Sequence, residues 1–379
     1  MGMALGKREE RLSASGQKRI LAIDAAGPRG ILAAALLGGL ESRLRKERND
    51  PELRLWDHFD LIGGGSSGAL LAAALAAGAS AEEACELYLD VGPEAKTAPR
   101  GDGVRRPKFE SARLLNWLEA AFGDAKIGDP RIRTGLAILV KPLEAAAPEI
   151  WANTPGAAHQ DTSFAHAIRA SLGGESLLDS EGGFADGALG WAANPIWPLL
   201  HFAMDPNGLN WPLGPGKLSI TSLGAGRMRP DLAKRVFEAP HDANPTALAA
   251  NIATRAAFAL DSALFESSEA ALAAMALLAH PLAPRGAALL DFERIDVDLS
   301  PEHLARLGLS PTEISVAIQR APISASSLAL WRRIGEAAST AAPQTPNSEK
   351  AGAARKPRAR APNRLAALSG LIGAPAKKP

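Results

Sequence analysis

Short apolar runs alternate with longer segments of helical periodicity along most of the chain. The apolar runs cover Arg19–Asp24, His58–Ile62, Leu136–Val140 and Leu218–Thr221, and Phe292–Val297 is a further predicted strand that includes three charged residues. Runs of this length, bounded by glycine-containing turns, are typical of buried strands.

The segments between these runs predict helices. Between Ile31 and Lys46 the leucines recur every three or four residues, which is the spacing of one helix face. Further helices are predicted from about Ser67, over Ala81–Asp90 with Ser80 as N-cap, and over Thr246–Glu266, Ser268–Ala279 and Ala325–Ala337. Strand, turn and helix repeated in this way indicate an α/β fold with a mostly parallel central sheet covered by helices.

Composition and charge narrow the class of protein. The 379 residues are 46% hydrophobic and 22% charged, as in ordinary globular domains, and the net charge of +1 gives no sign of nucleic-acid binding. The single cysteine, Cys85, excludes an internal disulfide and a cysteine-based zinc site. No group of His, Asp and Glu has metal-ligand spacing, so we expect neither a metal nor a cofactor.

The charge is unevenly distributed and suggests three segments. Residues 343–379 carry eight basic residues and one acid, so this end is +7 and the rest of the chain is −6. We expect a polar N-terminal leader over 1–17, one folded domain over 18–337, and a disordered Pro/Ala-rich basic tail over 338–379. A solvated tail and a peripheral contact with an anionic membrane are the two interpretations of the tail.

One uncharged segment, Leu61–Ala81, is long enough to span a bilayer. It consists mainly of Gly, Ser and Ala, and its first six residues are typical of a turn, which disfavours a transmembrane helix. The polar first 18 residues do not resemble a secretory signal. The expected location is therefore the cytoplasm, with the tail as a peripheral contact at a membrane.

The turn after the second predicted strand matches the pattern G-x-S-x-G, with Gly64, Ser66 and Gly68. Where a strand reverses sharply into a helix, glycines prevent collision and the serine hydroxyl is presented at the tip of the turn. The apolar run before Gly64 and the alanine-rich segment after Gly68 supply this context, so Ser66 is a candidate nucleophile.

A rival interpretation uses the same glycines. Gly63, Gly65 and Gly68 also spell G-x-G-x-x-G, the dinucleotide-binding pattern. That pattern requires a strand ending in an acid about 20 residues further on, whereas Ala81–Asp90 predicts a helix. Nucleotide binding is therefore the weaker hypothesis.

Two more turns carry candidate chemistry. The first predicted strand ends in Asp24-Ala-Ala-Gly-Pro-Arg-Gly30, whose small residues can direct backbone N–H groups toward a developing oxyanion. Asp186 precedes Gly187 and Ala188 in a predicted turn, and an aspartate near a serine hydroxyl can act as its general base. Because the carboxyl ends of parallel strands share one sheet edge, the first turn and the Ser66 turn are expected to face each other.

Together these three motifs resemble the patatin-like phospholipases, and the resemblance extends over about Lys18 to Ala337. The segments RILAIDAAGPRGILAAALLGGLE, HFDLIGGGSSGALLAAAL and LSITSLGAGR occur in the order typical of that family, and Asn194-Pro195 follows the Asp-Gly element as in its members. The resemblance implies a patatin-like three-layer fold and a lipid acyl hydrolase that works through a Ser–Asp dyad.

The resemblance also implies residue roles. Ser66 would be the nucleophile and Asp186 its base, with an oxyanion hole formed by Ala25, Ala26 and Gly27. The remaining motif residues would support these turns: Asp24, Arg29, Gly30, Gly64, Gly68, Gly187 and Ala188.

The chain departs from the family pattern in the first turn, where Ala25 and Ala26 stand in place of two glycines. If either position needs a positive φ, alanine adds strain of order 1 kcal/mol. Three hypotheses therefore remain: an active lipid acyl hydrolase, a catalytically weakened protein of the same fold that binds lipid or a protein partner, and a nucleotide-binding protein. A Ser–Asp–His triad is disfavoured because no catalytic-type loop surrounds His201, His241, His280 or His303.

Overall fold

A seven-stranded sheet forms the centre of the computed structural model, which describes residues 7–25, 27–94, 111–173, 183–189, 193–229, 245–280, 286–318 and 324–341. The strand order is β4-β3-β2-β1-β6-β7, and β5 pairs with β3 beside this path. The strands are β1 (Lys18–Ile23), β2 (Leu61–Gly65), β3 (Gly135–Pro142), β4 (Glu149–Ala152), β5 (Phe184–Ala185), β6 (Leu218–Leu223) and β7 (Asp291–Ile295). All neighbours are parallel except β4 and β5, which run antiparallel to β3. The predicted α/β class with a mostly parallel sheet is confirmed.

The sheet separates two hydrophobic cores because successive side chains of a strand point to opposite faces. On β1, Leu21 and Ile23 belong to one core, whereas Ile20 and Ala22 belong to the other. All four are fully buried, as expected for a central strand covered on both sides.

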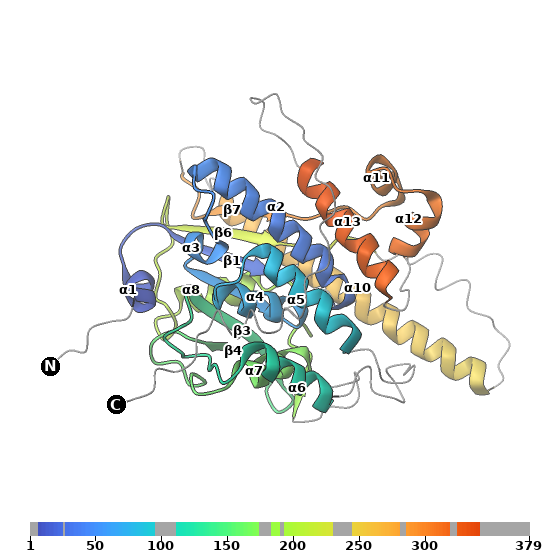
Figure 1. Ribbon diagram of the computed structural model, residues 1–379, viewed down its shortest axis with the longest axis horizontal. Coiled ribbons are helices and arrows are strands. Elements are labelled where there is room, and N and C mark those ends of the chain that lie inside the picture. The colour runs from blue at the N-terminus through green and yellow to red at the C-terminus, as the bar shows by residue number, and fades with distance from the viewer. Residues whose placement is uncertain are drawn as a thin grey trace.

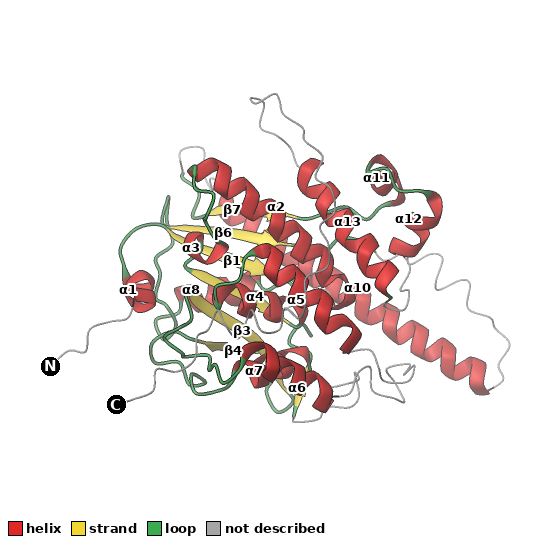
Figure 2. Cartoon of the chain, viewed as in Figure 1, coloured by secondary structure: helices red, strands yellow, loops and turns green. Residues whose placement is uncertain are grey.

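Six of the described helices cover one face of the sheet (Figures 1 and 2). They are α2 (Gly30–Arg48), α4 (Ser67–Ala76), α5 (Ala81–Glu94), α6 (Ser111–Phe122), α7 (Phe164–Leu172) and α13 (Ala325–Ala341). Helix α4 consists of buried residues throughout and lies directly over β2 and β3. The helix that follows the candidate nucleophile is therefore at the centre of the larger core.

Two helices, α8 (Ile196–Met204) and α10 (Pro245–Ala279), contribute to the core on the opposite face. Met275 of α10 packs in that core, while one end of the helix extends beyond the sheet (Figure 1). Shorter elements are α1 (Lys7–Ser13), η1 (Gly27–Arg29), α3 (Leu55–His58), α11 (Pro301–Arg306) and α12 (Pro311–Ile318). The sheet is thus enclosed between helical layers.

Several predicted boundaries are wrong. Residue His58 ends the short helix α3, and β2 begins only at Leu61 and continues through Gly65, so the three glycines extend a strand instead of forming a turn. The two helices predicted on either side of Ser267 form the single helix α10. Strands β4 and β5 were not predicted, because each is only two to four residues long.

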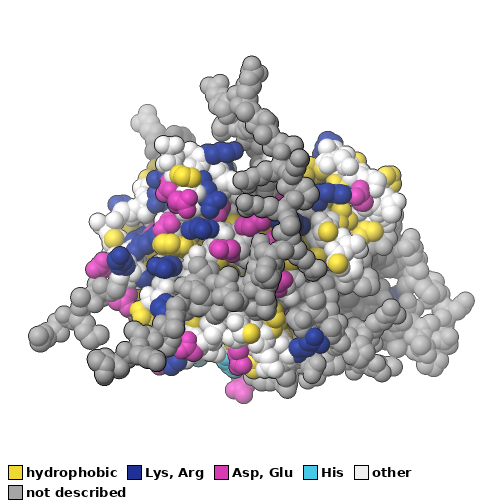
Figure 3. Space-filling model, viewed as in Figure 1, with side chains coloured by type: hydrophobic (Ala, Val, Ile, Leu, Met, Phe, Trp, Pro, Cys, Tyr) yellow, Lys and Arg dark blue, Asp and Glu magenta, His cyan; other side chains and the backbone are white. Residues whose placement is uncertain are grey.

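The three-segment division stays a prediction. Helix α1 lies within the predicted leader, and its Leu12 packs in the core that also contains Ile20. Helix α13 continues to Ala341, and the basic tail beyond it lies outside the described residues. On the face seen in Figure 3, basic and acidic side chains of the described residues are interspersed.

One segment among the described helices, Phe258–Ala279 of α10, meets the length and hydropathy criteria for a membrane span. This is weak evidence, because core helices meet the same criteria. The uncharged segment Leu61–Ala81 instead contains β2 and the ten-residue buried helix α4.

Candidate functional site

The Ser66 turn joins β2 to α4 and reverses the chain sharply as its sequence predicts, but Ser66 is buried instead of exposed at the tip. Ser66 has φ 54° and ψ −127°, a conformation that non-glycine residues rarely adopt. A Cβ at Gly64 would lie 2.6 Å from the carbonyl carbon of Gly68, and one at Gly68 would collide with the carbonyl oxygen of Ile23. Both glycines are therefore required for the close approach of the turn to α4 and to the end of β1.

Asp186 lies directly beside Ser66, although 120 residues separate them in sequence. The Ser66 Oγ donates a hydrogen bond to Asp186 Oδ2 at 2.9 Å, and Asp186 Oδ1 accepts the Ala188 N–H at 2.9 Å. The Ser66 residue is only 4% exposed, so few waters can compete for this hydrogen bond. This pair has the arrangement of a nucleophile and a general base.

Strand β5 brings Asp186 to this position. Ala185 pairs with Lys141 at the carboxyl end of β3, and β3 is the neighbour of β2. A Cβ at Gly187 would collide with the carbonyl oxygen of Leu139, so glycine allows the Asp186 turn to lie against β3. The Asp-Gly pair is thus fixed by close packing as well as by turn chemistry.

The turn after β1 lies at the same sheet edge, since Ile23 pairs with Gly64 of β2. The Ala25 N–H donates to the carbonyl of Ala193 at 3.2 Å. Ala25 is not among the described non-glycine residues with positive φ, whereas Gly27 has φ 49°. Alanine is therefore unstrained at position 25, and Ala26 lies outside the described residues.

Tyr88, on α5, supports this turn from the side. Its hydroxyl donates to the carbonyl of Gly27, and burial raises the pKa of the phenol. A Cβ at Gly30 would lie 2.5 Å from the Tyr88 hydroxyl, which explains why glycine stands there. Sequence reasoning missed Tyr88, although it is the only tyrosine in the chain.

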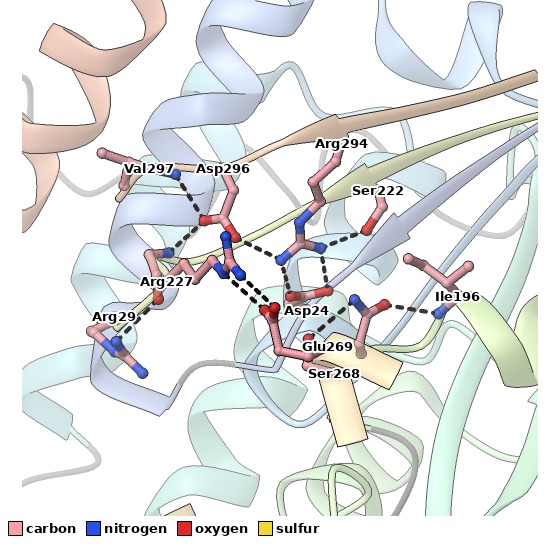
Figure 4. A network of polar contacts seen from close by, with 12 residues as sticks. Asp24, Arg29, Ile196, Ser222, Arg227, Ser268, Glu269, Arg294, Asp296 and Val297 are labelled. Carbon is pink, nitrogen blue, oxygen red and sulfur yellow. Dashed lines mark hydrogen bonds and ion pairs between the residues drawn. The ribbon is translucent and has the colours of Figure 1, made fainter. Parts of the chain in front are cut away.

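A buried ionic network lies behind the same turn (Figure 4). Arg294 of β7 contacts both carboxylate oxygens of Asp24, at 3.0 and 2.6 Å, and also donates to Ser222 of β6 and to Asp296. Asp24 is 7% exposed. The network joins the carboxyl ends of three strands. Asp24 directly follows β1, Ser222 lies in β6, and Arg294 lies in β7.

The Asp24 carboxyl is held in an unusual electrostatic state. Burial raises its pKa from 3.8 to about 6, Arg294 opposes this rise, and Asp296 adds to it. Asp296 accepts the N–H of Gly226, and the carbonyl of Gly226 accepts a hydrogen bond from Arg29 at 3.2 Å. Both charged residues of the first motif, Asp24 and Arg29, therefore bind elements outside it.

The geometry gives less support to a dinucleotide site and to a Ser–Asp–His triad. Gly63 and Gly65 lie within β2, and the chain continues from α4 into α5 instead of into the strand that a dinucleotide site requires. His201 and His280 are exposed, and His303 lies in α11; His241 is outside the described residues. Within the described ranges, no group of three or more His, Cys, Asp or Glu side chains could hold a metal ion.

Comparison with known proteins identifies the domain. Residues 21–200 match the family model of the patatin-like phospholipases. This segment of the chain is similar to that family. The matched segment includes Ser66 and Asp186, and the match supports a lipid hydrolase in general.

Curated relatives match a shorter segment. Patatin-17 of Solanum cardiophyllum is 34% identical over 115 residues, which are 28% of this chain and 29% of the relative. A protein of Solanum tuberosum named probable inactive patatin-3-Kuras 1 is 32% identical over 115 residues, covering 28% of this chain and 30% of that protein. The chain thus spans less than a third of the length of these relatives.

Solved structures of distant proteins also align. VipD from Legionella pneumophila aligns at 10% identity with a TM-score of 0.39, covering 87% of this chain and 67% of VipD. The ExoU–SpcU complex of Pseudomonas aeruginosa aligns at 16% identity with a TM-score of 0.30, covering 71% of this chain and 56% of the other.

Proposed function

We propose that this protein is a serine-dependent lipid acyl hydrolase that cleaves ester bonds of phospholipids or related lipids. The observation that supports this proposal most directly is the 2.9 Å hydrogen bond from Ser66 Oγ to Asp186 Oδ2. The match of residues 21–200 to the patatin-like phospholipase family supports a lipid substrate. The substrate class, the dyad and the reaction below are parts of the proposal.

Acylation begins when Ser66 Oγ attacks the ester carbonyl carbon while its proton passes to Asp186 Oδ2. The carbonyl π electrons move to the oxygen, which becomes the oxyanion of a tetrahedral intermediate. Collapse of this intermediate breaks the bond to the leaving alkoxide. Asp186 returns the proton to that alkoxide, so a neutral alcohol departs and Ser66 remains as an ester.

Deacylation repeats these steps with water. Asp186 accepts a proton from water, the hydroxide oxygen attacks the acyl carbon, and the second tetrahedral intermediate collapses to a fatty acid and Ser66. Because the same carboxylate acts as base and then as acid in both halves, two side chains are sufficient for the proton transfers.

The oxyanion is assigned to backbone N–H groups of the turn formed by Ala25, Ala26 and Gly27. The Ala25 N–H is engaged by the Ala193 carbonyl at 3.2 Å, so its use would require this hydrogen bond to open when substrate binds. Gly27 and Ala26 are the remaining donors of the turn. A weakened oxyanion hole is the basis of the second candidate function, a lipid-binding protein with little turnover.

Labelling with a fluorophosphonate probe, followed by hydrolysis assays on a short-chain ester and on phospholipid vesicles, tests the proposal. Ser66→Ala should abolish labelling and hydrolysis. Asp186→Asn should lower both by about 100-fold or more, because an amide cannot accept the proton, although its oxygen can still accept the Ala188 N–H.

Ser80→Ala is a matched control. Ser80 is 5% exposed and caps α5 by accepting the Glu83 N–H, so this variant loses a buried hydroxyl away from the dyad. It should be less stable and remain fully active. Absence of labelling in a well-folded wild-type protein would contradict the hydrolase and favour the lipid-binding function.

A further inference from the structure

The hydroxyl of Ser171 lies fully buried at the last turn of α7 and makes two hydrogen bonds. Its Oγ accepts the N–H of Ser66 at 2.9 Å and donates to the carbonyl of Leu139 on β3 at 2.6 Å. Ser171 is 0% exposed. A buried hydroxyl that both donates and accepts has its geometry fixed from two directions.

The backbone of the same residue holds the other half of the candidate dyad. The carbonyl of Ser171 accepts the N–H of Gly187 at 2.8 Å, and Gly187 directly follows Asp186. Gly173 packs so closely against the Asp186 backbone that a Cβ there would collide with it. The end of α7 therefore contacts the Ser66 turn and the Asp186 turn at once.

The contact with Ser171 stabilises a strained backbone conformation at Ser66. Ser66 has a positive φ, and its N–H is buried, so without an acceptor the turn would keep both its strain and an unsatisfied donor. The Ser171 hydroxyl supplies that acceptor from a helix that is itself anchored to β3. It also engages the Ser66 N–H, so this N–H is not directed at an oxyanion.

We propose that Ser171 is a positioning residue that holds the Ser66 and Asp186 turns at reacting distance, an inference that rests on the proposed hydrolase function. The Ser171 side chain holds the Ser66 turn by accepting the Ser66 N–H, and the Ser171 carbonyl holds the Asp186 turn by accepting the Gly187 N–H. Ser171 itself does not touch the ester. Its loss displaces the nucleophile relative to its base while leaving the substrate surface in place.

The test is Ser171→Ala, assayed with a soluble short-chain ester and with a fluorophosphonate. We expect kcat to fall about 10- to 100-fold while KM stays within about two-fold, because misplacement of a reacting group by about 1 Å can cost about 100-fold. The second-order rate of Ser66 labelling should fall by the same factor as kcat.

Thr134→Val is the matched control. Thr134 is also 0% exposed, and its hydroxyl donates to the carbonyls of Phe59 and Asp60 at the opposite ends of the strands. Both variants lose a buried hydroxyl and should have lower melting temperatures. Only Ser171→Ala should lose kcat and labelling rate, which a purely structural role would not explain.

Two outcomes distinguish the proposals. A folded Ser171→Ala protein with wild-type kcat and labelling rate would overturn the role of Ser171 and leave the hydrolase standing. A wild-type protein that neither hydrolyses esters nor labels would overturn both.

If Ser171→Ala does not fold, Ser171→Cys carries the test. Its thiol is a weaker donor and acceptor, so kcat should fall about 3- to 10-fold, and an unchanged kcat would refute the proposal.

Discussion

Substitution of Asp24 by asparagine should change how stability depends on pH. The folded-state pKa of Asp24 is about 6, against an ordinary value of 3.8, mainly because the carboxyl is buried. The folded protein therefore binds this proton more tightly than the unfolded chain. The stability that Asp24 contributes is fully present below about pH 4 and is lost as the pH rises through about 6. A rise of about two pH units in pKa corresponds to about 3 kcal/mol.

Urea unfolding of wild-type protein and of Asp24→Asn at several pH values between 4 and 8 measures this effect. The difference in free energy of unfolding, wild type minus variant, should fall by about 3 kcal/mol between pH 4 and pH 7 and then stay level. Asp298→Asn is the control of opposite sign. The backbone N–H of Ser300 lowers the pKa of Asp298 below its ordinary value of 3.8, so that difference should rise with pH only below about pH 4 and stay level between pH 4 and 8. A constant difference for Asp24→Asn, or one that rises, would refute the reasoning.

Three further predictions concern the first turn and the tail. Ala25→Gly alone should leave kcat within about two-fold, because Ala25 needs no positive φ. If the Ala25–Ala26 pair weakens the oxyanion hole, the double change of both residues to glycine should raise kcat roughly 3- to 30-fold. Tyr88→Phe leaves the Gly27 carbonyl without its donor, so it should destabilise the protein by about 1–3 kcal/mol in thermal unfolding and lower kcat; wild-type values for both would contradict this. Truncation after Thr340 should preserve hydrolysis of a soluble ester and weaken binding to anionic vesicles at low salt; equal binding by both proteins would leave the tail as a solvated segment.

The sequence predicts the local geometry of the Ser66 turn because that geometry depends on neighbouring residues. Gly64 and Gly68 are needed where the turn approaches Ile23 and α4, and no other residue type fits the space. The apolar runs predict β1, β3 and β6 for a similar reason, since a strand buried on both faces needs a continuous apolar segment. Both signals lie within about ten residues of the feature that they indicate.

The residues that sequence reasoning missed act over long distances in the chain. Ser171 meets the Ser66 turn across 105 residues, Tyr88 meets Gly27 across 61, and Arg294 meets Asp24 across 270. Nothing in the segment around any of them marks its partner. Arg294 is one of three charged residues in β7, which reads Asp-Phe-Glu-Arg-Ile, so the strand itself does not single it out.

Element boundaries were missed where short-range preference and tertiary pairing disagree. Three consecutive glycines favour a turn, yet Gly63 and Gly64 are strand residues because they pair with Ala137 and Ile138 of β3 as well as with β1. A Cβ at Gly63 would lie 2.6 Å from the Leu199 side chain, so this glycine also lets α8 approach the sheet. The packing of α8 on the far face of the sheet thus explains why a strand contains glycine at this position, although a run of glycines is typical of a loop.

Ser66 and Asp186, the proposed dyad, are joined by one hydrogen bond, and the precision of the candidate site comes from the residues behind them. Ser171 binds the turn of the nucleophile and that of the base, Tyr88 binds the carbonyl of Gly27, and Arg294 binds the carboxylate that precedes Ala25. Each of the three turns at the sheet edge is therefore held by a polar group from an element outside the motifs, which for the Asp186 turn is the main-chain carbonyl of Ser171. A chain that kept the motifs and lost these contacts would retain the reactive groups without their alignment, so its activity would fall even though its motif residues were unchanged.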